Sequence, residues 1–133
     1  MDAPREVKVA IALSWTVLFI ETAERLWRIS ISPDANTFTR LRLVWTVVTL
    51  FSTALVAILI FFASRRHNWG RIGLIVSTLG GWCLWYFWTR SVTEYLGWQW
   101  LVFGSVTAME LAVLILLFHG NGAAWYRSPP SGR

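Results

Sequence analysis

The sequence has few of the residues that carry chemistry. Its one cysteine, Cys83, cannot form a disulfide within the chain, and its two histidines, His67 and His119, have no partner at metal-ligand spacing. It also lacks the Gly-x-Ser-x-Gly elbow of serine hydrolases, the His-Glu-x-x-His pair of metalloproteases and a glycine-rich phosphate loop. These absences argue against an enzyme, and we expect no catalytic residue, metal or cofactor.

Charged residues are also scarce, at 14% of the chain, whereas a soluble domain usually carries about 25%. Hydrophobic residues make up 56%, and the mean hydropathy is +0.52. The net charge of +5 could suggest a nucleic-acid partner, but the sequence has no basic tail and no recognition motif. Lys and Arg concentrate at the ends of membrane-spanning helices, which accounts for the basic balance. We therefore expect a lipid bilayer as the solvent and no nucleic acid.

Four long apolar runs occupy most of the chain, at about residues 7–31, 41–63, 69–89 and 97–118. A helix needs roughly 20 mostly apolar residues to cross a bilayer. The sequence therefore predicts a single all-α membrane domain over residues 1–133, a four-helix transmembrane bundle. Residues 119–133 include three glycines and two prolines, and we expect them to form a frayed cytoplasmic tail.

Basic residues that flank the runs predict the orientation. Seven lie on the side of the N-terminus: Arg5, Lys8, Arg65, Arg66, Arg71, Arg127 and Arg133. Five lie on the other side: Arg25, Arg28, Arg40, Arg42 and Arg90. Because cytoplasmic loops carry the excess of Lys and Arg, this count favours a multi-pass protein with both termini in the cytoplasm.

Two short stretches resemble a loose group of small four-span bacterial inner-membrane proteins. Residues 65–71 read R-R-H-N-W-G-R and look like that group's R-x-x-N-W-[AG]-R segment. Residues 116–118 and 124–127 look like its L-L-F and A-W-[FY]-R close. The likeness covers about a dozen residues, together with length and span count. It implies a bacterial inner membrane and no particular chemistry, because the group has no established activity.

The aromatic and basic residues of these stretches also have a simpler interpretation. Trp69 and Arg71 at the start of the third run, and Trp125 and Arg127 after the fourth, are typical anchors at lipid headgroups. A shared way of ending helices at a membrane surface is enough to explain both motifs. We therefore expect these four side chains to face the headgroup region.

Charges inside the runs need an explanation, because each costs at least about 2.5–3.5 kcal/mol at the bilayer centre. Glu21 in the first run and Glu110 in the fourth are predicted at nearly the same depth. Glu21 and Arg25, and likewise Glu24 and Arg28, are four residues apart and share a helix face. Glu110 has no basic residue within one helical turn. We expect its partner to be Arg25 or another group of the first helix.

Three interpretations of this charge network remain open. It could be an ion-pair network that fixes which helices are neighbours. It could be a path for a proton or a cation that uses Glu21 and Glu110. It could also be a docking site for a charged helix of another subunit.

Small residues recur at four-residue spacing in three of the runs. They are Thr49, Thr53 and Ala57 in the second, Gly73, Ser77 and Gly81 in the third, and Gly104, Ala108 and Ala112 in the fourth. Such stripes let helix backbones approach closely in lipid. We expect them to serve packing within the chain, with a neighbouring subunit as the alternative.

The third run also carries an aromatic group, formed by Trp82, Trp85, Tyr86 and Trp88. Most tryptophans in the sequence fall near predicted helix ends, as in the aromatic belt of membrane proteins. This group is denser than a belt needs. It is therefore a candidate contact surface for a lipid, a quinone or a partner protein.

Together these features favour a non-enzymatic accessory or interaction subunit that works with other membrane proteins or with copies of itself. The alternative is a small homo-oligomeric transporter or channel, with Glu21 and Glu110 as its functional carboxylates.

Overall fold

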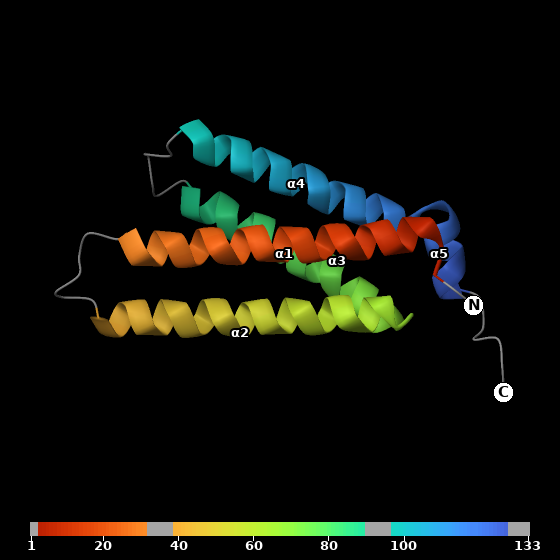
Figure 1. Ribbon diagram of the computed structural model, residues 1–133, viewed down its shortest axis with the longest axis horizontal. Helices are drawn as coiled ribbons and strands as arrows, with labels where there is room; N and C mark the ends of the chain where they lie inside the picture. The colour runs from red at the N-terminus through yellow and green to blue at the C-terminus, as the bar shows by residue number, and fades with distance from the viewer. Residues whose placement is uncertain (1–2, 32–38, 90–96, 128–133) are drawn as a thin grey trace.

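The computed structural model describes residues 3–127, except 32–38 and 90–96. Within this part of the chain there are five helices and no strands: α1 (Arg5–Ile31), α2 (Thr39–Ser64), α3 (Asn68–Thr89), α4 (Gly97–Phe118) and α5 (Gly120–Arg127). The all-α prediction is confirmed. The four long helices coincide with the four apolar runs, and α5 lies across one end of them (Figure 1).

The arrangement of the four long helices is uneven. α1 packs along both α2 and α4, and α2 packs along α3, whereas α3 makes few contacts with α4. In Figure 1, α3 passes obliquely behind α1, beside the end of α2 at one extreme and near the start of α4 at the other. α3 therefore diverges from α2 along its length, and the four helices do not close tightly around a common axis.

The best-packed part of the core lies near α5, at what is here named the α5 end. Three large side chains are almost completely buried there, Val7 of α1, Ile60 of α2 and Leu117 of α4, and Ala10 and Ala63 beside them are fully buried. Toward the opposite end the outward-facing residues of α2 are mostly large and apolar, as expected for a lipid-facing surface. The α5 end therefore holds the bundle together.

Two positive-φ residues shape the α5 end. α2 ends at Ser64 and is capped by Arg66, which has a φ of 68°. The amide of His67 donates to the carbonyl of Phe62, the pattern of a Schellman cap. Gly120, with a φ of 54°, turns the chain from α4 into α5. Glycine tolerates this conformation without the steric cost that a side chain would add.

The tail prediction is wrong for residues 120–127, which form α5 instead of fraying. Gly122, Ala123 and Trp125 are buried against the long helices, and a side chain at Gly122 would collide with the backbone of Leu116. The tertiary contacts of the tryptophan stabilise this short helix, and local propensity alone could not have predicted them. The rest of the tail, 128–133, lies outside the described residues.

Within the described part of the chain, two helices are long and apolar enough to cross a membrane: Arg42–Ser64 within α2 and Gln99–Phe118 within α4. α1 is longer but carries the charges of Glu21, Glu24 and Arg25 in its second half, and α3 is rich in glycine and tryptophan. By helix composition, the structure is thus an all-α fold with two candidate membrane-spanning helices. The predicted four-span bundle goes further than this finding.

Candidate functional site: a polar cavity between the helices

A cavity of about 290 Å³ lies between the four long helices. Its polar lining comes from all of them: Ser14, Glu21, Thr22 and Arg25 of α1, Ser52 and Thr53 of α2, Ser77 and Thr78 of α3, and Glu110 of α4. Its volume is close to the lower limit of ordinary ligand pockets, which is roughly 300 Å³. The two carboxylates that the sequence predicted at one depth therefore line the same cavity.

The divergence of α3 explains why this space exists. Gly80 and Gly81, on the α3 wall, are exposed, and a methyl group added at either would meet nothing within 4 Å. Leu84, one turn further along, is 74% exposed although it also lines the cavity. The cavity is thus open toward the outside of the bundle along α3.

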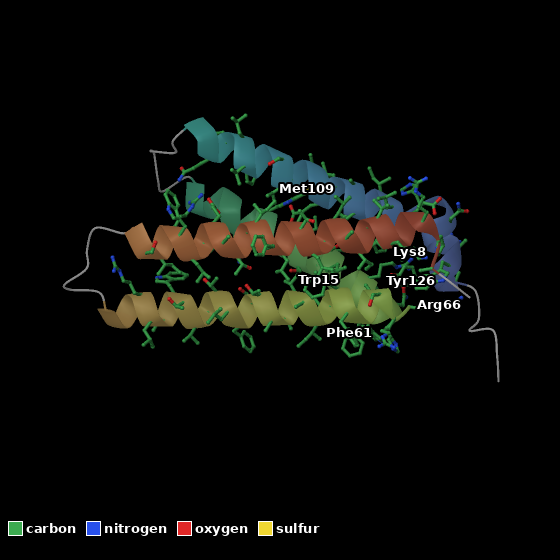
Figure 2. All side chains as sticks on the ribbon, in the orientation of Figure 1. Lys8, Trp15, Phe61, Arg66, Met109 and Tyr126 are labelled. Carbon is green, nitrogen blue, oxygen red and sulfur yellow. The ribbon has the colours of Figure 1, made fainter. Side chains whose placement is uncertain are left out.

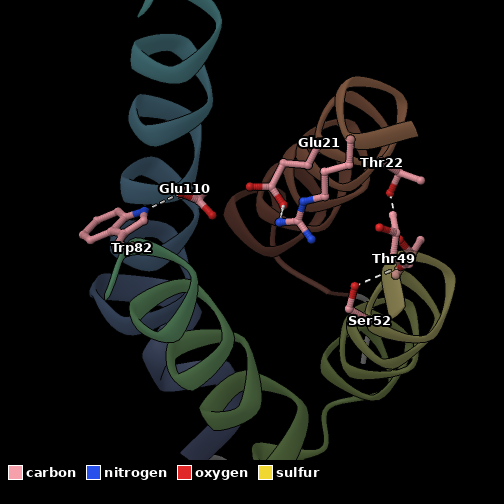
Figure 3. Close-up of polar contacts among 8 residues, drawn as sticks. Glu21, Thr22, Thr49, Ser52, Trp82 and Glu110 are labelled. Atoms are coloured by element: carbon pink, nitrogen blue, oxygen red, sulfur yellow. Dashed lines mark hydrogen bonds and ion pairs between the residues drawn. The ribbon is translucent and has the colours of Figure 1, made fainter. Parts of the chain in front are cut away.

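Glu110 is held by an aromatic residue and not by a basic one. The indole Nε1–H of Trp82 on α3 donates a hydrogen bond to the carboxylate Oε2 of Glu110, with 2.6 Å between the two atoms (Figure 3). The prediction that the partner of Glu110 is Arg25 or another group of the first helix is wrong, because Trp82 lies on α3. Arg25 is held by Glu21 on its own helix, so its guanidinium neutralises the nearer carboxylate.

Both pairs predicted four residues apart on α1 are formed. Arg25 Nη2 lies 3.2 Å from Glu21 Oε2, and Arg28 Nε donates to Glu24 Oε1 at 2.7 Å. All four side chains are between about one quarter and one half exposed. Only the first pair lines the cavity; Glu24 and Arg28 lie outside it. The two pairs are therefore not one continuous network.

The charges of the cavity do not cancel when all are ionised. Its lining includes two carboxylates, Glu21 and Glu110, and one guanidinium, Arg25. Figure 3 shows the side chains of Glu21 and Glu110 pointing toward one another from α1 and α4. Among the described lining residues one negative charge remains, and a single proton or monovalent cation would neutralise it.

Hydroxyl groups connect the α1 and α2 walls. The side chains of Thr22 and Thr53 are 3.0 Å apart between their oxygens, and Ser52 donates to the carbonyl of Thr49 within α2 (Figure 3). Thr49 and Thr53 belong to the small-residue stripe predicted on α2. The sequence analysis did not predict Thr22 as a residue of this site. Its position directly after Glu21 was the one signal that could have indicated it.

The predicted packing residues have different surroundings. Gly73 packs against Leu59 of α2, as a packing residue should. Ser77 and Gly81 instead line the cavity. Gly104 and Ala108 of α4 are exposed, and a methyl group added at Gly104 would meet nothing within 4 Å. The prediction of packing within the chain is therefore wrong for the α4 pair.

One tight contact between helices was missed. Gly70 of α3 is buried, and a side chain there would collide with the backbone of α2 at Leu59, Phe62 and Ala63. This glycine lies inside the R-x-x-N-W-[AG]-R segment. The sequence analysis interpreted that segment, through Trp69, as an anchor at the lipid headgroups and not as a contact between helices. Of the predicted aromatic group, Trp82 contacts Glu110; the side chains of the other three members, Trp85, Tyr86 and Trp88, lie outside the described part of the structure.

The two motif stretches contact each other at the α5 end. Arg66 Nε donates to the carbonyl of Trp125 at 2.7 Å, and the phenol of Tyr126 donates to the carbonyl of Ala63 at 2.7 Å. The guanidinium of Arg71 lies 4.4 Å and 4.7 Å from the ring centroids of Phe118 and Tyr126. These contacts join α5 to the turn between α2 and α3 and form what is here named the motif junction.

The motif junction corrects the predicted headgroup anchors. Trp125 is only 9% exposed, and Arg71 stacks on aromatic rings, so both take part in intrachain packing. Trp69, at 80% exposed, and Arg127 do face outward. Sequence spacing could not distinguish the packed residues from the outward-facing ones, because the contacts of the motif junction join residues more than 40 positions apart.

No family model matches the chain, and no solved structure matches it. Among the described residues, no group of three or more His, Cys, Asp or Glu side chains lies close enough to hold a metal ion.

Proposed function

We propose that the chain is a small four-span membrane protein, with both termini in the cytoplasm of a bacterium, that carries one proton or monovalent cation through its central cavity at Glu110. The observation that carries this proposal is the uncompensated negative charge of a cavity lined by four helices. This is the transporter or channel alternative of the sequence analysis, and the geometry favours it over the docking of a charged helix.

Size separates the two interpretations. One turn of an α-helix is about 10 Å across and 5.4 Å long, so it occupies roughly 400 Å³. The cavity, at about 290 Å³, is smaller than a single turn. A cation with a few water molecules fits, whereas a helix from another subunit would require the bundle to open.

The surfaces of α1 and α3 support four crossings. α1 lies between α2 and α4, so it would cross the same hydrocarbon layer if they do. Glu21 and Arg25 of α1 line the cavity, while Phe19, nearby on the same helix, is 76% exposed. α3 likewise exposes Ile72 and Leu79, which do not line the cavity. Polar groups turned inward and apolar groups turned outward are the arrangement expected in lipid.

Proton flux through liposomes tests the proposal. The purified full-length chain would be reconstituted with a trapped pH-sensitive dye, and a pH gradient would be applied with the membrane potential clamped by potassium and valinomycin. We expect wild-type protein to dissipate the gradient and Glu110→Gln to reduce the rate at least about tenfold, because the amide cannot bind the proton. Thermal unfolding in detergent would show that the variant is folded.

Glu24→Gln is the matched control. It also replaces a glutamate by glutamine, but on α1 and outside the cavity, where Glu24 pairs with Arg28. We expect it to keep wild-type flux. Equal rates for wild type and Glu110→Gln would contradict the proposal.

A second candidate, the accessory or interaction subunit, is favoured by the exposed small-residue face of α4. Gly104 and Ala108 leave room for the backbone of another helix to approach closely. If this is the function, the purified chain alone should show no flux, and a stoichiometric membrane partner should accompany it in a gentle detergent.

A further inference from the structure

Basic residues are concentrated at the α5 end of the molecule. The described residues there include six basic side chains, Arg5, Lys8, Arg65, Arg66, Arg71 and Arg127, and one acidic side chain, Glu6. Figure 2 shows Lys8, Arg66 and Tyr126 gathered at this end. The single carboxylate accepts a hydrogen bond from Asn121 at the start of α5, and this bond lowers the pKa of Glu6 below its usual range. Glu6 is thus bonded to an uncharged group of the protein and neutralises at most one of the six basic side chains. The α5 end as a whole is therefore strongly positive.

The motif junction determines which of these cations face outward. Arg66 and Arg71 are turned inward, onto the carbonyl of Trp125 and onto the rings of Phe118 and Tyr126. Arg65 is exposed, and its guanidinium has no hydrogen-bond acceptor among the described residues. Because Arg66 fixes the turn through its contact with α5, the backbone at Arg65 is held in one position. Arg65 is thus an outward-facing cation on a preorganised turn.

One aromatic ring lies against this cation, and two more are exposed on residues close to it in the sequence. The Arg65 guanidinium lies 5.1 Å from the ring centroid of Phe61, which is 50% exposed. Phe62 and Trp69 are exposed on the same turn, at 43% and 80%. A guanidinium above exposed rings matches a phospholipid, whose phosphate lies above its glycerol and acyl chains.

We propose that the outer surface of the turn between α2 and α3, formed by Arg65, Phe61, Phe62 and Trp69, binds the phosphate headgroup of an anionic phospholipid. The occupant is a lipid of the surrounding bilayer, because the exposed apolar ring of Phe61 lies directly beside the cation. A net positive end favours an anionic headgroup over a zwitterionic one. This surface is separate from the cavity, so the inference does not depend on transport, but it rests on the membrane insertion of the proposed function.

Native mass spectrometry of the full-length chain in detergent, titrated with equal amounts of phosphatidylglycerol and phosphatidylcholine, tests this surface. We expect wild-type protein to retain phosphatidylglycerol in preference to phosphatidylcholine. Arg65→Gln should weaken the phosphatidylglycerol adduct about fivefold, the effect of one cation near an anionic surface. Thermal unfolding would show that this exposed substitution leaves the fold intact.

Arg42→Gln is the matched control, since it removes the same charge at the opposite end of α2. It should leave the adduct unchanged. Equal retention of the two lipids would overturn the proposal, because binding would then not depend on the charge of the headgroup. Equal weakening by both substitutions would also overturn it, because binding would then depend on the total charge of the protein and not on this surface. Displacement of the lipid by poly-glutamate with higher affinity would also overturn it, in favour of an acidic protein partner.

Discussion

At the scale of single residues, Glu110 is the most informative side chain. Among the described residues its carboxylate accepts a hydrogen bond from Trp82 and forms no ion pair. A hydrogen bond from an indole stabilises the ionised form less than a guanidinium would, so the carboxylate retains its capacity for a proton or a cation. The sequence indicates that Glu110 is unusual, because no basic residue lies within one turn of it. It does not indicate Trp82, because that contact depends on how α3 is rotated against α4.

Tyr126 gives a prediction about stability. Its phenol donates to the carbonyl of Ala63 at 2.7 Å and ties α5 to α2. Tyr126→Phe should lower the free energy of unfolding by about 1 kcal/mol, the net value of one such hydrogen bond. Thermal or denaturant unfolding in detergent would measure the change. Ser105→Ala is the control, since its exposed hydroxyl bonds only to the carbonyl of Val102 within its own helix; an equal loss in both variants would contradict the role of Tyr126.

The same residue gives a pH dependence. Burial raises the pKa of Tyr126 from 10.0 to about 12, while the nearby Arg71 lowers it. Since the pKa is higher in the folded state, the stability that the phenol contributes is complete below about pH 10 and is lost as the pH rises toward 12. The difference between wild type and Tyr126→Phe should therefore shrink over this range. A difference that stays constant to pH 12 would contradict the burial of the phenol.

At the scale of helices, α3 has two different ends. Near its start it packs tightly on α2 through Gly70 and Gly73, and further along Gly80 and Gly81 are open. The sequence shows a single small-residue stripe over this helix and predicts uniform packing. The structure differs because α3 diverges from α2, which the pattern of one helix cannot encode. This divergence creates the cavity.

Two alanine substitutions in α3 should therefore have opposite effects. Gly70→Ala adds a methyl group that collides with the α2 backbone at Ala63, and we expect a loss of about 1–3 kcal/mol. Gly80→Ala meets nothing, and alanine is favoured over glycine within a helix by roughly 0.5–1 kcal/mol. Unfolding of both variants under one set of detergent conditions measures the contrast. Similar effects of the two substitutions would contradict the divergence of α3.

The helices themselves were predictable, whereas α5 was not. Long apolar runs determine where α1 to α4 form, because an extended chain in lipid would leave its backbone polar groups without hydrogen bonds. Residues 120–127 contain two glycines and read as a loose tail. Their helix depends on Trp125 and Tyr126 contacting the turn between α2 and α3. That contact joins both stretches of the resemblance, and it gives a structural reason for their residue types.

At the scale of the whole molecule, the cavity can carry an ion across the membrane as proposed only if all four long helices cross the membrane. α2 and α4 have the length and composition of membrane spans. α1 and α3 are proposed to cross because they pack beside these two and turn their polar groups inward. If only α2 and α4 crossed, the segment 90–96 would lie on the same side as the turn at Ser64. With four crossings, the two lie on opposite sides.

Cysteine labelling in spheroplasts tests this most directly. In a Cys83→Ser background, single substitutions Ser64→Cys and Thr93→Cys would be treated with a membrane-impermeant maleimide before and after permeabilisation. We predict that Thr93→Cys reacts in intact spheroplasts and that Ser64→Cys reacts only after permeabilisation. Protection of both positions until the membrane is permeabilised would contradict the four-span bundle, and with it the place of Glu110 inside the membrane.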